Sequence, residues 1–339
     1  MSSIKECRIG LLGAARITPP AIILPAQENP AAKLVAIAAR DNERAKRFAA
    51  EHHVSRVVDS YQALVEDAEL DLIYNALPAS EHLPWTMKAL AAGKNVLCEK
   101  PIALNADEAQ DMVALADAQG CLMIEAFHYR YHPVIARVLE LLAHNTLGEI
   151  KLIEGVFNVA IENTQDIRYQ KALGGGALMD LGCYPVHWLR TCMGAEPEIL
   201  SASASVTEAD VDISLSGEMI FPSGAVGRIA CSMAPGLKME NVLRIQGTDG
   251  SLEVINPLVP HFGYQMTLRE RAQNEDQQGE FKQDIRVTGK STYHHQLDAV
   301  VELLSGQGTQ ITGGQDCVNN MRAIDSLYRA AGVSEFQRN

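Results

Sequence analysis

The sequence predicts an α/β fold in two parts: a doubly wound parallel sheet over residues 1–126, and an α+β domain with a large, mostly antiparallel sheet over residues 127–339. Two observations lead to this prediction. In the first part, short apolar segments alternate with longer Ala-rich segments, which is the pattern of parallel strands joined by crossover helices. In the second part, strand-like segments follow one another through tight turns, which is typical of an antiparallel sheet.

Five apolar segments are expected to form the strands of the first part. They are Cys7–Leu12, Lys33–Ala39, Asp71–Ala76, Asn95–Cys98 and Leu122–Glu125. Between them lie the helical segments Glu43–Glu51, His82–Ala92 and Ala106–Gln119. Gly93 and Gly120 follow two of these helices, where a glycine suits the left-handed residue that ends a helix. Strands and helices that alternate in this way predict a parallel sheet.

The second part is expected to open with a helix over Pro133–Asn145 and to continue mainly as strands. These strands are Glu149–Ile161, Ser201–Thr207, Val211–Phe221, Ala225–Ser232, Asn241–Gln246 and Ser251–Ile255. Pro222-Ser223-Gly224 and Gly247-Thr248-Asp249-Gly250 supply turn signals between them. We expect the polar segment Glu270–Gln283 to form a long mobile loop, and two helices, Tyr293–Leu304 and Gln315–Ala331, to end the chain.

Composition narrows the class of protein. The chain has 339 residues, 47% of them apolar, and a net charge of −13, which argues against nucleic acid and anionic membranes as partners. No apolar run approaches the roughly 20 residues of a membrane span. The first six residues lead directly into a strand, so we expect no signal peptide. Seven cysteines without a Cys-x-x-Cys pair fit the reducing cytoplasm, where we expect the protein to reside.

A lysine follows one of the buried strands of the first part, in the run Glu99-Lys100-Pro101 after Asn95–Cys98. The carboxyl ends of the strands in an open α/β sheet border the crevice where ligands bind. A lysine at this position can donate a proton or lower the pKa of a neighbouring hydroxyl group. Lys100 is therefore a candidate catalytic residue.

The loop after the first strand, Gly10–Thr18, has the features of a phosphate-binding loop. Aligned with the dinucleotide pattern G-x-G-x-x-G, it places Gly13, Ala15 and Thr18 at the three glycine positions. Small residues here let the backbone approach a pyrophosphate. Arg16 and Thr18 are expected to contact phosphate as well, so the loop predicts a nicotinamide dinucleotide as cofactor.

The end of the second strand distinguishes NAD from NADP. NAD sites commonly place an acidic residue there, whereas NADP sites place an arginine that binds the 2′-phosphate. This chain has Ala39-Arg40-Asp41. Arg40 offers a planar pair of donors suited to a phosphate. Asp41 either serves NAD or caps the helix that follows. We expect NADP to be preferred over NAD.

With these motifs in place, the chain resembles the Gfo/Idh/MocA oxidoreductases over nearly its whole length. The resemblance rests on the Gly-rich loop, on Leu77-Pro78 with His82, on the run from Ala92 to Pro101, on Gly174–Gly182 and on the hairpin Gln246–Leu252. It implies a Rossmann NAD(P)-binding domain followed by a domain for substrate binding and oligomerisation. The expected cofactor-binding residues are Gly13, Ala15, Arg16, Ile17, Arg40, Leu77, Pro78, His82, Glu99 and Lys100.

The resemblance also implies roles for a second motif, Asp180-Leu181-Gly182-Cys183-Tyr184-Pro185-Val186-His187. The family reads Asp-x-Gly-x-His-x-x-Asp here, and its aspartate and histidine line the substrate. This chain keeps Asp180, but tyrosine replaces the histidine at Tyr184 and histidine replaces the second aspartate at His187. In this it resembles the dimeric dihydrodiol dehydrogenases, the NADP-dependent D-xylose dehydrogenases and some sugar ketoreductases, where the tyrosine is the expected general acid/base. An inositol dehydrogenase is correspondingly less favoured.

The chemistry of the predicted set is consistent. A free tyrosine titrates near pH ~10, too high for an efficient base at neutral pH. A nearby ammonium favours the phenolate, so Lys100 beside Tyr184 supplies a base, and Asp180 is expected to orient either group. His187 either binds substrate hydroxyls or is a hydrogen-bonded core histidine.

Other candidates complete the expectations. Phe127 and Arg130 are expected to border the substrate pocket, and Glu125 is either a pocket residue or a buried, hydrogen-bonded carboxylate. His128 and His132 have metal-compatible spacing on an expected helix, but no nearby carboxylate or cysteine completes a site and Pro133 interrupts the segment, so no metal is expected. A homodimer or homotetramer is expected, built on the free face of the second sheet.

Two classes of function remain open at this point: an enzyme and a non-catalytic regulator that senses NAD(P). The enzyme is expected to be an NADP-dependent oxidoreductase acting on a sugar, either an aldose or a ketosugar, or on a cyclic vicinal diol. An NAD-dependent dehydrogenase of polyols is the alternative enzyme. Keeping Lys100, Asp180 and Tyr184 together favours the enzyme, because a sensor has no chemical need for this set.

Overall fold

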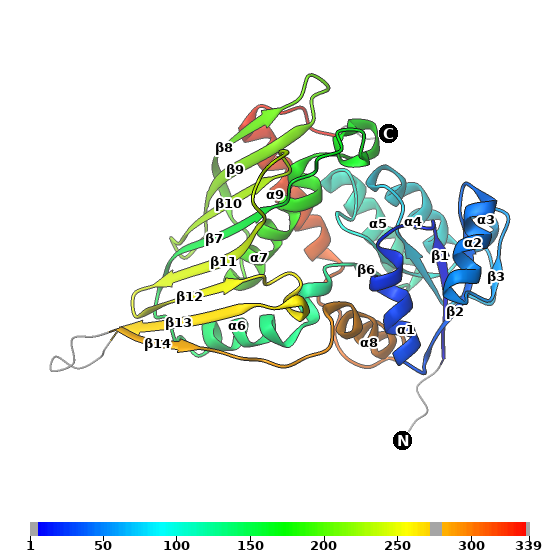
Figure 1. Ribbon diagram of the computed structural model, residues 1–339, viewed down its shortest axis with the longest axis horizontal. Coiled ribbons are helices and arrows are strands. Elements are labelled where there is room, and N and C mark those ends of the chain that lie inside the picture. The colour runs from blue at the N-terminus through cyan, green and yellow to red at the C-terminus, as the bar shows by residue number, and fades with distance from the viewer. Residues whose placement is uncertain (1–5, 272–279, 337–339) are drawn as a thin grey trace. The chain divides into compact units, whose positions relative to one another are not determined.

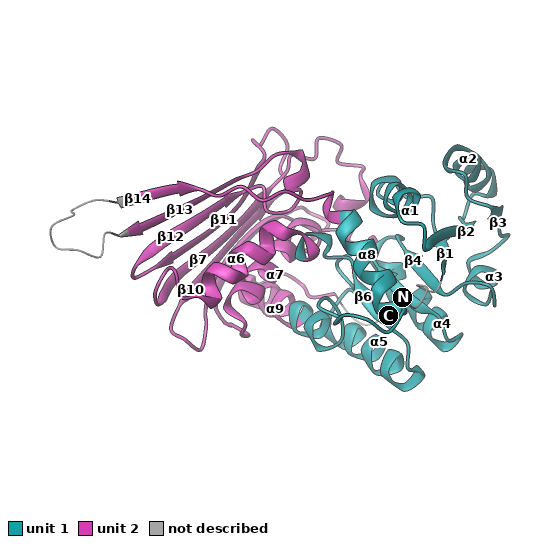
Figure 2. Ribbon diagram, turned by 90° about the horizontal axis from the view of Figure 1, so that it is seen from below, with its two compact units in different colours: residues 1–130, 293–321, 337–339 teal, residues 131–292, 322–336 magenta. Residues whose placement is uncertain are grey.

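The structure, a computed structural model, describes residues 6–271 and 280–336, which form two compact units (Figure 2). Unit 1 contains the described residues up to Arg130 together with Tyr293–Met321, and unit 2 contains Tyr131–Thr292 and Arg322–Phe336. The sequence analysis placed both C-terminal helices in the second domain. In the structure, the first of them and the start of the second belong to unit 1.

Unit 1 holds a parallel sheet of six strands in the order β3-β2-β1-β4-β5-β6 (Figure 1). The strands are β1 (Cys7–Leu12), β2 (Ala32–Ala38), β3 (Arg56–Val57), β4 (Leu72–Asn75), β5 (Asn95–Cys98) and β6 (Met123–Glu125). The order reverses direction between β1 and β4, which is the switch point of a doubly wound sheet. The predicted parallel fold is confirmed, and the carboxyl ends of β1, β4 and β5 meet at one edge.

The helices of this unit largely follow the predicted segments. They are α2 (Asn42–His52), α4 (His82–Ala91), α5 (Ala106–Gln119), α8 (Thr292–Leu304) and the start of α9 (Gln315–Ala331). The sequence analysis missed a π-helical turn, η1 (Pro19–Ile23), which continues into α1 (Leu24–Glu28), and the short α3 (Tyr61–Val65). Each spans only five residues, too short to show a helical period.

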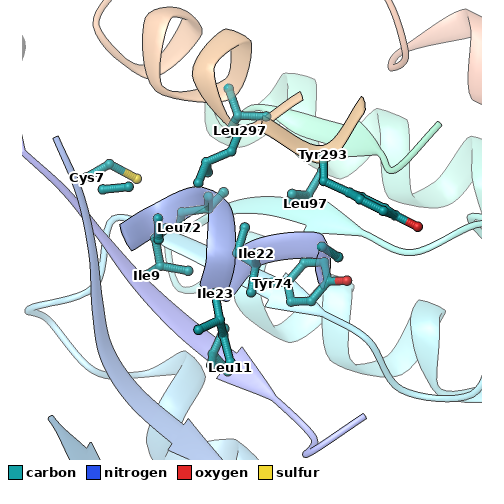
Figure 3. Close-up of a cluster of buried hydrophobic side chains, with 14 of the residues drawn as sticks. Cys7, Ile9, Leu11, Ile22, Ile23, Leu72, Tyr74, Leu97, Tyr293 and Leu297 are labelled. Carbon is teal, nitrogen blue, oxygen red and sulfur yellow. The ribbon is translucent and has the colours of Figure 1, made fainter. Parts of the chain in front are cut away.

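Burial of apolar side chains explains why α8 belongs to unit 1. Side chains from β1, β4 and β5 form a core with Ile22 and Ile23 of η1 and with Tyr293 and Leu297 of α8 (Figure 3). Leu297 is fully buried there. The segment after α8 also pairs with β6, because Thr312 accepts a backbone hydrogen bond from Glu125 at 2.7 Å.

Unit 2 is built on a sheet of eight strands in the order β14-β13-β12-β11-β7-β10-β9-β8 (Figure 1). The strands are β7 (Ile150–Asn158), β8 (Glu198–Val206), β9 (Asp212–Ile220), β10 (Val226–Ser232), β11 (Glu240–Gly247), β12 (Gly250–Ile255), β13 (Gln265–Arg271) and β14 (Glu280–Asp284). All neighbours pair antiparallel except β7 and β10. The predicted mostly antiparallel sheet is confirmed.

The prediction of a long loop over Glu270–Gln283 was wrong at both ends. Glu270 and Arg271 end β13, and Glu280–Gln283 lie in β14, which pairs with it. Residues 272–279 lie outside the described part of the chain. The polar composition hid the strands, because solvent-facing residues of an edge hairpin are as polar as those of a loop.

Two helices, α6 (Pro133–Ala143) and α7 (Cys183–Met193), lie on the same face of this sheet (Figures 1 and 2). Gly155 of β7 lets α7 approach closely, because a Cβ atom at this position would lie 3.0 Å from Pro185 and 3.1 Å from Leu189. This close packing fixes the helix that begins with Cys183 and carries Tyr184 and His187.

Candidate active site

The loop after β1 passes closely over the neighbouring strand end. Gly13 has φ +84°, and its amide donates to the carbonyl of Ala38 at 2.8 Å. A Cβ atom here would lie 3.0 Å from the Leu77 side chain, so a glycine suits both the conformation and the space. The side chain of Arg16 is exposed, and Ala15 and Ile17 are half-buried.

Thr18 does not fit its predicted contact with phosphate. It is fully buried, and its amide donates to the carbonyl of Ala15 at 3.1 Å. The hydroxyl oxygen is buried as well, so it is not presented to a ligand. The sequence placed Thr18 correctly in the loop, but the chain turns inward at this residue before η1.

Arg40 and Arg44 follow the end of β2, and Asp41 between them caps the next helix. Asp41 caps α2, because its Oδ1 accepts from the amide of Arg44 at 3.0 Å. Of the two roles left open for Asp41, the structure shows the cap. The Arg40 amide donates to the Tyr61 hydroxyl at 3.2 Å. Among the residues that the structure describes, no carboxylate pairs with the exposed guanidinium of Arg40.

The sequence analysis missed Arg44 as a member of this group. Its Nη2 donates to the carbonyl of Ala14, in the loop after β1, at 2.5 Å. Arg44 therefore connects the start of α2 to the predicted phosphate loop. Its position four residues after Arg40 is the signal that could have found it, because residues near the start of this helix face the same strand end as Arg40. Two guanidinium groups thus border this edge of the sheet.

His82 joins the loops that follow β4 and β5. Its Nδ1 lies 2.8 Å from the carbonyl oxygen of Pro101, and its Nε2 lies 2.8 Å from that of Leu77. Burial lowers the pKa of His82 to about 4, and the two carbonyls act in the opposite direction. The predicted cofactor-binding run Leu77-Pro78 is therefore tied through this imidazole to the Glu99-Lys100-Pro101 segment.

Glu99, next to Lys100, is fixed by a buried hydrogen bond. The Tyr74 hydroxyl of β4 donates to Glu99 Oε1 at 2.7 Å. Burial first, and then the charge of Glu99, raise the pKa of Tyr74 well above its usual value. Lys100 itself is half-buried and precedes a cis peptide bond to Pro101. The chain on either side of Lys100 is thus held in place, by Tyr74 through Glu99 and by His82 through Pro101.

Three other predicted residues take structural positions in unit 1. Phe127 is fully buried, with its ring 6.3 Å from that of Tyr129, whereas Arg130 is half-buried. Glu125 is fully buried and accepts from the amide of Ile102 at 2.9 Å, which is the second of its two predicted roles.

The prediction that His128 and His132 share a helix was wrong. His128 begins a 3-10 turn, η3 (His128–Tyr131), and His132 is the N-cap of α6, where its Nδ1 accepts from the Val134 amide at 3.1 Å. The four-residue spacing of the two histidines is not helical, because Pro133, which interrupts the segment, begins a new helix. Within residues 6–271 and 280–336, no group of three or more His, Cys, Asp or Glu side chains is arranged to hold a metal ion.

In unit 2, Asp180 lies in a π-helical turn, η6 (Leu178–Gly182), that continues into α7. Its carboxylate accepts from Arg168 Nε at 2.5 Å, and Arg168 also pairs with Asp166 at 3.1 Å. The charge of Asp180 is the largest cause that raises the pKa of Arg168. Arg168 was missed, and no sequence signal pointed to it, because a short irregular segment brings it to Asp180.

Tyr184 and His187 lie one turn apart on α7. Tyr184 is 5% exposed, with its ring 5.8 Å from that of Phe157 and 6.5 Å from that of Trp188. His187 is 1% exposed. Asp180, Tyr184 and His187 therefore belong to one continuous helical segment of unit 2, while Lys100 and the predicted cofactor-binding residues belong to unit 1.

Two family models match the chain. Residues 7–127 match the model described as oxidoreductase family, NAD-binding Rossmann fold, and residues 135–253 match the GFO/IDH/MocA C-terminal domain. The two matches agree with the sheets of unit 1 and unit 2. They account for more than half of the chain. None of the described helices is long and apolar enough to cross a membrane.

Characterised relatives and solved structures are similar over most of the chain. A D-xylose 1-dehydrogenase (NADP(+)) of Haloferax volcanii is 31% identical over 95% of this chain and 96% of its own. A trans-1,2-dihydrobenzene-1,2-diol dehydrogenase of Sus scrofa is 33% identical over 69% of each chain. A 3-ketoreductase of Actinomadura kijaniata, solved with NADP and TDP-benzene, has a TM-score of 0.85 and 27% identity over 96% of this chain and 98% of its own. Solved variants of that ketoreductase include a tyrosine-to-phenylalanine and a lysine-to-alanine replacement.

Proposed function

The chain belongs to the Gfo/Idh/MocA oxidoreductase family, and we propose that it transfers a hydride between NADP and a sugar or a cyclic vicinal diol. The observation that carries this proposal is the presence of three ionisable groups, Lys100, Asp180 and Tyr184, at the motif positions where the family holds its reacting groups. The named relatives act on a sugar, a diol and a nucleotide-linked ketosugar, which supports the same substrate class.

NADP as the cofactor is supported by the residues at the end of β2. Within residues 6–271 and 280–336, no carboxylate pairs with Arg40 or Arg44, and Asp41 is occupied as the cap of α2. A planar guanidinium binds a phosphate through two donors, whereas a ribose hydroxyl gains little from it. When bound, the nicotinamide supplies or accepts the hydride; the residues of this chain hold the dinucleotide and move the proton.

We expect Arg40→Ala to raise the KM for NADP far more than the KM for NAD. The 2′-phosphate is the only group that distinguishes the two dinucleotides, and Arg40 has no ion-pair partner in the described residues that would give it another role. Steady-state kinetics with both dinucleotides measures the difference. Arg16→Ala is the matched control, since it removes an exposed arginine from the same edge but is expected to affect both cofactors similarly. Equal effects of Arg40→Ala on NADP and NAD would contradict the assignment.

For the proton, we assign the exchange with the substrate oxygen to Tyr184 and the lowering of its phenol pKa to the Lys100 ammonium. Asp180 accepts a hydrogen bond from Arg168, and we assign its carboxylate the role of acceptor for a substrate hydroxyl. His187, close to Tyr184 in sequence, is the second candidate for contact with substrate hydroxyls.

A panel of substrates tests the proposed function. Aldoses, ketosugars and cyclic vicinal diols are each incubated with NADP or NADPH, and the absorbance of the reduced nicotinamide is followed. We expect turnover with at least one class and a preference for NADP. Tight binding of NADPH without turnover of any class would instead indicate the alternative, a regulator that senses the dinucleotide. Turnover of polyols with NAD in preference to NADP would indicate a polyol dehydrogenase.

We also propose that the chain forms a homodimer or a dimer of dimers through the face of the unit 2 sheet opposite α6 and α7. On that face, charged residues of alternating sign lie side by side across adjacent strands: Glu218, Arg228, Glu154, Arg244 and Glu253. The Arg228–Glu218 and Arg244–Glu253 pairs are both 2.9 Å apart. A row of alternating charges is complementary to a second copy of itself turned by a two-fold axis.

Light scattering at micromolar concentration is expected to give the mass of two or four chains. The double variant with Arg228→Glu and Arg244→Glu has only negative charges along the row. We therefore expect it to dissociate toward single chains while keeping its fold. Arg47→Glu on α2, which lies in unit 1, is the control for a change of surface charge. A wild-type protein with the mass of one chain would contradict the proposal.

A further inference from the structure

The helical segment that carries Asp180 and Tyr184 begins without a cap of its own. The first amides of a helix have no partner within it and require acceptors from elsewhere. The residue at the N-cap, Ala177, offers no side-chain hydrogen bond. An acceptor comes instead from a distant residue, Asp212 on β9, which is held by Tyr328 on α9.

Asp212 connects the start of the helix to Tyr328 through two hydrogen bonds. The Leu178 amide donates to Asp212 Oδ2 at 2.7 Å, and the Tyr328 hydroxyl donates to Asp212 Oδ1 at 2.8 Å. The backbone amide of Met179 is close enough to the Tyr328 hydroxyl to lower its pKa. Asp212 and Tyr328 are each 2% exposed. The Leu178 amide at the start of η6 is therefore bound by a buried carboxylate from outside the helix, and Tyr328 holds that carboxylate.

Gly176 shows how closely this arrangement is packed. Its φ of +142° is open mainly to glycine, and a Cβ atom here would lie 2.2 Å from Asp212 Oδ1 and 2.9 Å from the Tyr328 hydroxyl. The third glycine of the Gly174-Gly175-Gly176 run is thus required by the Asp212 and Tyr328 side chains. Gly176 of the family motif is therefore packed directly against Asp212 and Tyr328.

We infer that Asp212 and Tyr328 are positioning residues, which cap the start of η6 from outside and thereby set the orientation of Asp180 and Tyr184. They act through the helix and not by touching a ligand. The functional part of this inference rests on the proposed function. The capping part does not, because it concerns only the hydrogen bond of the Leu178 amide.

Three ionisable groups from other elements face Asp212: Tyr328 from α9, Lys171 from η5 (Lys171–Leu173) and Cys231 from β10. Burial raises the pKa of Asp212 to about 6, although the hydrogen bonds from Leu178 and Tyr328 and the charge of Lys171 act against this. Burial also holds the pKa values of Tyr328 and Cys231 well above their usual range. A proton bound to Asp212 occupies one carboxylate oxygen, so the cap weakens as the pH falls below about 6.

The test removes the hydroxyl of Tyr328 and measures the cap directly. In Tyr328→Phe, hydrogen–deuterium exchange over residues 176–184 should accelerate, because Asp212 loses the donor that holds its carboxylate against the Leu178 amide. The kcat should fall about ten- to a hundredfold, the usual effect of a small misplacement of reacting groups, with the KM for NADPH unchanged. Tyr264→Phe is the matched control, because its hydroxyl bonds to Val287 and not to the η6 segment.

Asp212→Asn separates capping from overall stability. Asparagine keeps one oxygen for the Leu178 amide and offers an N–H to the Tyr328 hydroxyl, so we expect slow exchange to be retained. Because asparagine does not titrate, the loss of kcat below about pH 6 should disappear in this variant.

Each outcome decides one part of the inference. Unchanged exchange in Tyr328→Phe would overturn the cap. Faster exchange with unchanged kcat, or a step in the kcat profile near pH 6 that is the same in Asp212→Asn as in wild type, would overturn the positioning role. If the wild-type protein turns over no sugar or diol, the proposed function fails, and the exchange measurement still decides whether the cap exists.

Discussion

Tyr184→Phe is expected to lower kcat by about 10²–10⁴-fold, the usual contribution of general acid/base catalysis. The substitution removes only the hydroxyl. The ring packs against Phe157 and Trp188, so the aromatic contacts of the buried tyrosine remain and the fold should be retained. Binding of NADPH should also be retained, because the predicted cofactor-binding residues lie in unit 1.

Two measurements check this expectation: kcat with the best substrate of the panel, and NADPH binding followed by fluorescence. Tyr169→Phe is the matched control in the same unit, since its hydroxyl bonds only to the carbonyls of Ile161 and Met233. If Tyr184→Phe keeps a near-native kcat while His187→Ala abolishes activity, the base is His187, and the assignment to Tyr184 is wrong.

Lys100→Met should lower kcat by a similar factor, about 10²–10⁴-fold, through loss of the ammonium. Without a neighbouring positive charge, a phenol pKa rises toward its free value near ~10, so less phenolate is present at neutral pH. Oxidation of an alcohol substrate should therefore recover as the pH is raised. The measurement is the pH profile of kcat in the oxidative direction for wild type and variant.

Lys88→Met serves as the control for the lysine substitution. Lys88 lies on α4 with its ammonium 4.2 Å from the centre of the Trp85 ring, outside the loops that carry the predicted site. Its replacement should leave the pH profile unchanged. A Lys100→Met profile that falls in amplitude but keeps the wild-type pH dependence would show that Lys100 does not set the protonation of the base.

The parallel sheet of unit 1 was largely predictable because each strand is short, apolar and flanked by helix or turn signals. β5 and α5 begin and end where the sequence analysis placed them. The strands of the antiparallel sheet were predictable where glycine and proline mark the turns between them. The outermost hairpin, β13 and β14, was not predictable, because polar and charged residues predominate in it as they do in a loop.

The local motifs of the site were predictable, but the contacts that orient them were not. Arg40 and Asp180 follow from pattern and resemblance, whereas the contacts of Arg44 and Arg168 depend on the local path of the chain. The Asp212–Tyr328 pair depends on a contact between segments far apart in the chain. Tyr328, for example, is separated from Asp212 by 116 positions. Thr18 was predicted at the correct position in the loop, but packing buries its side chain.

The measurement that tests the central claim most directly is a double-mutant cycle of kcat for Lys100→Met and Tyr184→Phe. If lysine and tyrosine act as one proton-transfer unit, either substitution alone removes most of the catalysis that the pair provides. The double variant should then be little slower than the slower single variant, because effects of groups that act together are not additive. A double variant whose loss equals the product of the two single losses would show that Lys100 and Tyr184 act independently, and would contradict the account.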